Sequence, residues 1–105
     1  INYNVMSSLG TEFKINVHVE PIDGLHMSDY DFTCRFYIYA NRNVNISKSE
    51  MIKVDNDNYI ACIDSSKLGV GTIMMRIIAQ IPDADFPDGL QTEIETISTG
   101  LVISR

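Results

Sequence analysis

The sequence predicts an all-β protein in which one sheet packs against another. Residues 12–20, 31–39 and 72–81 each alternate apolar with polar side chains, and no stretch keeps a convincing helical period. A period of two places the apolar side chains of a strand on one face. Because such a face must be buried against another layer, we expect a sandwich of two sheets.

Turn signals divide the N-terminal half into short strands. Ser-Ser-Leu-Gly at residues 7–10 and Pro-Ile-Asp-Gly at residues 21–24 each predict a turn. Residues 25–30 are expected to form a loop, and Asn-Arg-Asn at residues 41–43 is expected to end a strand. The strands expected in this half are residues 2–6 at an edge, 11–20, 31–40, 44–47 and 50–54.

The C-terminal half begins with a hairpin. Asp-Asn-Asp-Asn at residues 55–58 predicts a tight turn, after which residues 59–63 pair back on residues 50–54. A loop with one helical turn at residues 64–69, the longest strand at 70–81 and an acidic loop at 82–89 follow. Residues 90–103 form the last strand or pair of strands. The apolar phase changes within this last segment, so a bulge is expected near residues 96–100.

This order of elements is typical of one domain. A chain of 105 residues is expected to fold as a single unit, residues 1–105. Seven or eight short strands with no helices for crossovers predict an antiparallel β-sandwich of the immunoglobulin-like type. A small barrel is the alternative.

The charge balance argues against several partners. The net charge is −6, whereas binding to phosphate backbones or anionic lipids needs clustered Lys and Arg. We therefore expect no nucleic acid and no membrane partner, and no apolar run is long enough to span a bilayer. An acidic chain favours solubility or a cationic partner.

No catalytic or cofactor motif is present, so no enzyme and no cofactor are expected. His18 on the polar face of a strand and His26 in a loop have no neighbouring motif, and both are interpreted as surface histidines. Cys34 shares the inward phase of its strand whereas Cys62 has the outward phase, so a disulfide is not expected.

The acidic loop is a weak candidate for a metal site, and Asp55 and Asp57, which are interpreted first as turn formers, are a weaker one. Asp83, Asp85 and Asp88 could together supply oxygen ligands to calcium, although the spacing is not that of an EF-hand. The competing interpretation is a solvated turn between two strands. Phe86 is then expected to fold back and close the end of the core.

The outward phase of two strands predicts an interaction surface. If Phe36 and Ile77 face the core, the neighbouring positions face outward, and Tyr and Arg among them are enriched at binding hot spots. The competing interpretation is that β-propensity alone fills an outer face with such residues. The candidate interface residues are Arg35, Tyr37, Tyr39, Met74, Arg76 and Ile78.

A resemblance joins several of these segments. Asn-Tyr-Ile-Ala-Cys-Ile-Asp at residues 58–64 precedes Leu-Gly-Val-Gly at 68–71, and a long strand and an Asp/Pro loop precede Thr-Gly-Leu-Val-Ile at 99–103. With the strand at residues 11–19, this order resembles immunoglobulin-like sandwich modules of phage virions. The similar proteins are N-terminal domains of baseplate upper proteins and small structural proteins of phages and prophages of Bacteroides-type bacteria.

The resemblance implies a structural role. Such modules hold baseplate, tail or fibre components together, usually in trimers or higher rings, and carry no catalytic residues. It therefore implies a virion protein whose partners are other virion subunits, including copies of itself. The alternative is a secreted or cell-surface carbohydrate-binding or adhesion sandwich of a gut bacterium, with tyrosines or a calcium-assisted acidic loop as the binding surface.

Overall fold

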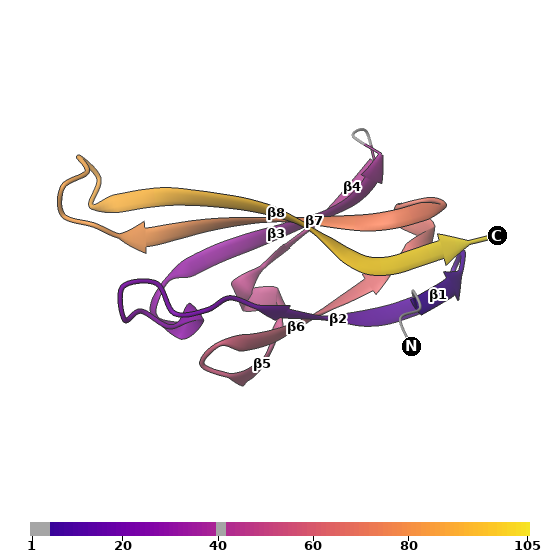
Figure 1. Cartoon of the computed structure of the whole chain (residues 1–105), viewed down its shortest axis with the longest axis horizontal. Coiled ribbons are helices and arrows are strands. Elements are labelled where there is room, and N and C mark those ends of the chain that lie inside the picture. The colour runs from indigo at the N-terminus through magenta and orange to yellow at the C-terminus, as the bar shows by residue number, and fades with distance from the viewer. Residues whose placement is uncertain (1–4, 40–41) are drawn as a thin grey trace.

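The computed structural model describes residues 5–39 and 42–105, which form two β-sheets packed face to face (Figure 1). The larger sheet has the strand order β1-β8-β7-β3-β4, and the smaller has the order β2-β6-β5. The predicted all-β sandwich is thus confirmed.

Eight strands and three short 3₁₀ turns make up the described part of the chain. The turns are η1 (Met27–Asp29), η2 (Lys48–Glu50) and η3 (Ser65–Lys67). The strands are β1 (Val5–Ser8), β2 (Glu12–His18), β3 (Asp31–Tyr39), β4 (Arg42–Ser47), β5 (Ile52–Asp55), β6 (Asn58–Asp64), β7 (Gly71–Pro82) and β8 (Leu90–Ser104).

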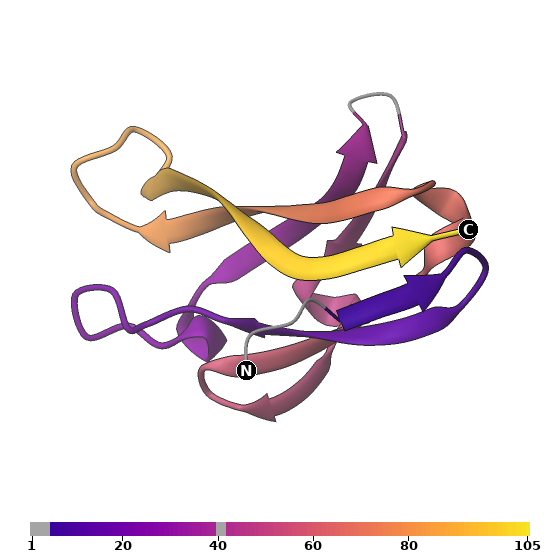
Figure 2. The same cartoon turned by 45° about the vertical axis from the view of Figure 1, so that its right-hand side comes forward.

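The pairing is antiparallel with one exception. The short strand β1 runs parallel to the end of β8, where Val5 lies opposite Leu101 (Figure 2). The hairpins β3–β4, β5–β6 and β7–β8 stay within one sheet, and the remaining connections cross to the other sheet. The sandwich is therefore antiparallel apart from this short parallel pairing at one edge.

The core lies between the two inner faces that the alternation predicts. Phe32, Cys34 and Phe36 of β3 are buried, and the same face of β7 buries Ile73 to Ile81 at alternate positions. Val17 of β2 closes the core from the smaller sheet. Phe36 is 0% and Ile77 is 5% exposed, so the predicted inward faces are confirmed.

Several element boundaries differ from the prediction. The longest strand is β8, with 15 residues against 12 in β7. Arg42 and Asn43 begin β4 instead of ending a strand, because they pair with β3 across the hairpin. Glu50 belongs to η2, where its carboxylate accepts the Ser47 backbone N–H and hydroxyl. Residues 2–4, 40 and 41 of the expected strands and turn lie outside the described residues.

The expected irregularity in β8 is present. Thr72 lies opposite Val102 but Met74 lies opposite Ser98, so residues 99–101 of β8 face a single residue of β7. Gly100 sits in this bulge with φ +76°, a left-handed conformation that glycine adopts without steric strain. The bulge re-aims the strand, and the segment beyond it returns to the core.

Candidate functional site

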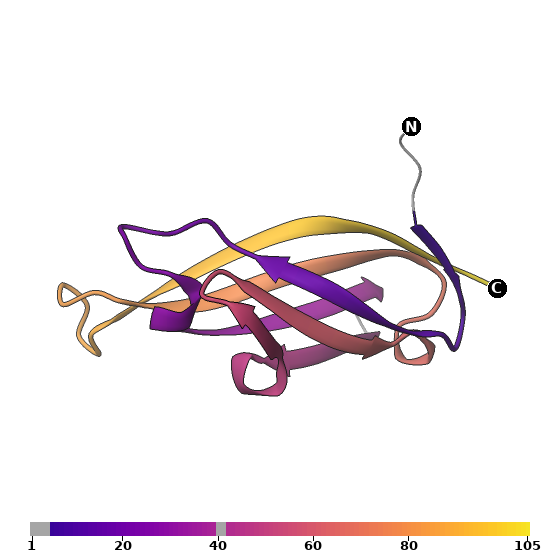
Figure 3. The same cartoon turned by 90° about the horizontal axis from the view of Figure 1, so that it is seen from below.

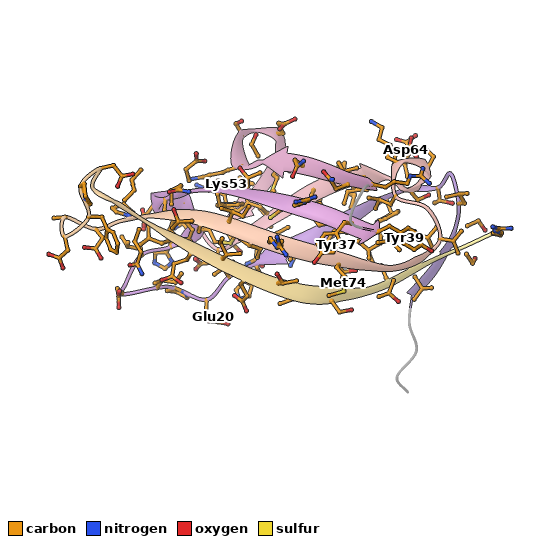
Figure 4. The ribbon with its side chains drawn as sticks, turned by 90° about the horizontal axis from the view of Figure 1, so that it is seen from above. Glu20, Tyr37, Tyr39, Lys53, Asp64 and Met74 are labelled. Carbon is orange, nitrogen blue, oxygen red and sulfur yellow. The ribbon has the colours of Figure 1, made fainter. Side chains whose placement is uncertain are left out.

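The predicted interface residues of β3 and β7 come together on the outer face of the larger sheet. The two strands are adjacent and antiparallel, so Arg35 lies opposite Arg76 and Tyr37 lies opposite Met74 (Figure 4). Ile78 is the next outward position of β7. Side chains directly opposite on one face of an antiparallel pair touch, so these five residues form one surface.

Two arginines flank one tyrosine ring at the centre of this surface. The guanidinium carbons of Arg35 and Arg76 each lie 6.0 Å from the centre of the Tyr37 ring, within cation–π range. Arg76 Nε also donates to Thr96 Oγ1 of β8, 3.3 Å away. Both guanidinium groups thus lie close to the same aromatic ring.

The immediate surroundings of the two arginines are not acidic. Among the described residues, the positions next to them on this face are Thr33, Tyr37, Asn45, Met74, Ile78 and Thr96, and none carries a carboxylate. Two like charges directly opposite each other on one face of a sheet repel each other. A chain with a net charge of −6 therefore presents a local cationic surface.

The same surface extends on to β8 through a residue that the sequence reasoning missed. Ile94 lies opposite Ile78 and is 61% exposed. Ile94 alternates in phase with Leu90 and Thr92, and this pattern could have assigned its face. The alternation changes phase later in β8, however, so the sequence did not show which phase faces the core. We call Arg35, Tyr37, Met74, Arg76, Ile78 and Ile94 the outer-face patch.

Tyr39 stands apart from this patch. The pairing of β3 with β4 shifts between Tyr37 and Tyr39, and the Tyr39 hydroxyl donates to the Val70 carbonyl oxygen at 3.1 Å. Its half-exposed ring borders a hollow of about 500 Å³ at one end of the sandwich, together with Arg42 and Arg105. The structure therefore assigns Tyr39 to this end of the sandwich.

The acidic loop does not form a metal site. Asp83 Oδ1 accepts the Asp85 backbone N–H at 3.0 Å, and Asp88 Oδ1 accepts that of Leu90 at 3.1 Å. These carboxylates shape the turn. No group of three His, Cys, Asp or Glu side chains that could hold a metal ion occurs within the described ranges.

The expectation that Phe86 folds back and closes the end of the core is wrong. It is 43% exposed instead of folded back on to the core. The β7–β8 hairpin extends past the smaller sheet, so its tip has no opposing layer to pack against (Figure 1).

The sequence suggested two isolated surface histidines, but each histidine has polar partners in the structure. His18 Nδ1 lies 2.8 Å from the Asp57 carbonyl oxygen and its Nε2 lies 3.1 Å from Glu20 Oε1. His26 Nδ1 lies 2.8 Å from Asp57 Oδ2. The Glu20 carboxylate and the Asp57 carbonyl raise the pKa of His18, and the Asp57 carboxylate raises the pKa of His26. Each of these partners is a carboxylate or a carbonyl and not a nucleophile. The contacts with Asp57 join the end of β2 and the β2–β3 loop to the β5–β6 turn.

The cysteines lie as the alternation predicts. Cys34 is buried in β3 and Cys62 is exposed on β6, and both are free thiols. Burial raises the pKa of the Cys34 thiol to about 12, which keeps it protonated and unreactive.

Comparison with known proteins finds no matching family model, no matching curated protein and no matching solved structure. Within the described residues, no helix has the length and apolar character needed to cross a membrane. Fold and surface together define the class: an all-β sandwich whose larger sheet presents a cationic, aromatic and aliphatic outer face.

Proposed function

We propose that this chain is a non-enzymatic structural module that docks to other protein subunits through the outer-face patch. The observation that carries the proposal is the Tyr37 ring flanked by Arg35 and Arg76. Aromatic and Arg side chains supply most of the binding energy at protein interfaces, and here exposed aliphatic side chains surround them.

The charges indicate the chemistry of the docked surface. The two adjacent guanidinium groups concentrate positive charge on this face, so a carboxylate of a partner can form charge-assisted hydrogen bonds there. The rest of the chain is acidic, so another copy can supply carboxylates in a head-to-tail contact. A homo-oligomer is therefore part of the proposal.

The proposal places the module in a phage virion, in a baseplate, tail or fibre attachment of the Bacteroides-phage kind. Its support is the sequence Asn-Tyr-Ile-Ala-Cys-Ile-Asp at residues 58–64 followed by Leu-Gly-Val-Gly at residues 68–71, together with the strand order. The larger sheet holds the last two strands beside β3, and an immunoglobulin-like topology, which is part of the proposal, would also place them so. Genes for portal, tail or capsid proteins beside this one would support the virion assignment.

A second candidate function is carbohydrate binding on a cell surface or by a secreted protein. The half-exposed Tyr39 ring beside Arg42, at the hollow of about 500 Å³, favours it. Tyrosine offers a flat apolar ring with a polar edge, which suits a sugar. A glycan array probed with and without a chelator separates this function from subunit docking.

Light scattering coupled to size-exclusion chromatography tests the docking proposal. We expect the wild-type chain to self-associate as its concentration rises, and Tyr37→Ser/Ile78→Ser to remain a monomer. Ile52→Ser is the matched control, because Ile52 is an exposed isoleucine on the other sheet. A strictly monomeric wild-type chain that the double substitution leaves unchanged would contradict the proposal.

A further inference from the structure

The first half of β8 is a free sheet edge. β7 pairs with one side of β8 from Leu90 to Ser98, whereas β1 pairs with the other side at residues 101–104 alone. Among the described residues, no strand covers that other side at residues 90–98. Every second residue of this edge therefore directs its backbone N–H and C=O away from β7, toward a position that an added strand could fill.

A partly apolar recess lies beneath this edge. A cavity of about 70 Å³ is lined by Val19, Ile22, Tyr30, Ile77, Ala79 and residues 93–95. A hollow of about 400 Å³ adjoins it between residues 18–22 and Glu95. β2 is itself an edge strand and lies on the same side of the sandwich as β8 (Figure 3). We call this region, between residues 18–22 and 90–98, the open side.

One buried polar atom in the wall of the cavity lacks a partner. Tyr30 is 4% exposed, and its Oη makes no hydrogen bond to any described residue. Buried hydroxyls are almost always hydrogen-bonded, so an exception needs an explanation. A polar group from a segment bound in the recess would satisfy it.

The charges along the open side are negative. Glu93 lies opposite Ala79 and Glu95 lies opposite Ile77, so both glutamates point to the inner side of the sheet. Glu20 lines the same hollow as Glu95. Inward-pointing charges on an edge strand prevent pairing with an identical edge, because antiparallel pairing centred on Ile94 would set Glu93 against Glu95 of the other copy. A second copy is therefore a poor occupant.

We propose that the open side binds an extended basic segment of a partner protein as an added strand on β8. Backbone hydrogen bonds to residues 90–98 hold the segment, and alternate Lys or Arg side chains on its inner face meet Glu93, Glu95 and Glu20. This is the geometry of strand addition, in which the backbone supplies affinity and alternate side chains supply specificity. The open side uses the edge and the inner side of β8 and shares only Ile94 with the outer-face patch, so the inference goes beyond the proposed docking function.

A synthetic peptide tests this proposal. The probe is an eight-residue peptide in which lysine alternates with valine or threonine. A second peptide of the same composition, with its lysines grouped at one end, is the control. Fluorescence anisotropy measures affinity, and amide chemical shifts with hydrogen-exchange protection locate the bound strand. We expect the alternating peptide to bind about tenfold more tightly than the grouped one and to protect amides at residues 90–98.

Charge variants give the second arm of the test. Glu93→Gln/Glu95→Gln should weaken binding of the alternating peptide about tenfold. Glu12→Gln/Asp85→Asn removes the same number of charges from exposed positions off the open side and should leave the affinity unchanged. Equal affinity for both peptides, equal weakening by both double variants or amide changes elsewhere would overturn the proposal. Self-association through residues 90–98 in both the wild-type chain and the Glu93→Gln/Glu95→Gln variant would also overturn it, because the glutamates would then not keep a second copy away from this edge.

Discussion

The two halves of β8 contrast a covered strand with a free one. Residues 101–104, the covered half, lie between β1 and β7, and Ile103 is 1% exposed. Residues 90–98, the free half, pair with β7 on one side and with no described strand on the other, and Ile94 is 61% exposed. Both halves belong to one continuous strand, Leu90–Ser104. The contrast teaches that neighbouring elements, more than propensity, decide which part of a strand contributes to stability and which part is available for binding.

The largest expected effect separates two isoleucines of this one strand. Ile103→Ala leaves a cavity between the sheets and should lower the free energy of unfolding by about 2–5 kcal/mol. Ile94→Ala removes an exposed side chain and should change it by less than about 0.5 kcal/mol. Urea denaturation followed by circular dichroism measures both. Similar losses for the two variants would abolish the distinction between the halves.

A smaller loss is expected at the bulge that separates the halves. Gly100 has φ +76° and nothing within 4 Å of the position of an added Cβ, so conformation alone opposes substitution. Gly100→Ala should therefore lower the free energy of unfolding by about 1–2 kcal/mol. Gly100→Asn should lose less, since asparagine tolerates the left-handed region. A neutral alanine variant would show that the bulge does not need glycine.

Thr99 provides a side-chain test of the same junction. Its Oγ1 donates to the Ile73 carbonyl oxygen at 2.8 Å and accepts the Leu101 backbone N–H at 3.2 Å. Thr99→Val keeps the shape but removes both hydrogen bonds, so a loss of about 1 kcal/mol in the free energy of unfolding is expected. Thr92→Val in the free half is the matched control and should lose less, because it removes only one solvent-exposed hydrogen bond, to Gln80 Oε1 at 3.1 Å. Equal effects at both positions would weaken the contrast.

The smallest expected effect is on pH dependence, through the loop that lines the recess under the free half. The raised pKa values of His18 and His26 mean that protonation stabilises the folded state. This stabilisation is fully present below the unfolded pKa of 6.5 and is lost as the pH rises through the higher folded values. The thermal midpoint should therefore be higher at about pH 6 than at about pH 8.

A variant isolates the histidine contribution from other effects of pH. His18→Gln/His26→Gln should show a smaller difference between the two pH values than the wild-type chain. Below that window the sign reverses, because hydrogen bonds lower the pKa of Asp55, Asp64 and Glu50 in the folded state. Their stabilisation is lost as the pH falls through those lowered values. An unchanged pH dependence in the double variant would contradict the role assigned to Asp57.

The alternation of apolar and polar residues predicted which face of the sheet each side chain lies on, but it did not predict which distant residues become neighbours. It assigned Phe36 and Ile77 to the core and Tyr37 and Ile78 to the outer face, because a side chain's face depends on local backbone geometry. It missed the contacts of His18 and His26 with Asp57, which lie 39 and 31 residues apart in sequence. Such contacts depend on how the β2–β3 loop meets the β5–β6 turn, and no local pattern encodes that meeting.

The amino-acid sequence by itself determined that this chain is a β-sandwich, which side chains of β2, β3 and β7 face the core, and that its two cysteines point to opposite faces. The period of two suffices for these features because each follows from one strand and its nearest turns. The tertiary structure alone decided that Arg35 and Arg76 share one tyrosine, that Phe86 is exposed, and that β1 pairs with residues 101–104 of β8 while no described strand pairs with that side of residues 90–98. These features depend on which strands become neighbours and where each sheet ends, and long-range packing sets both.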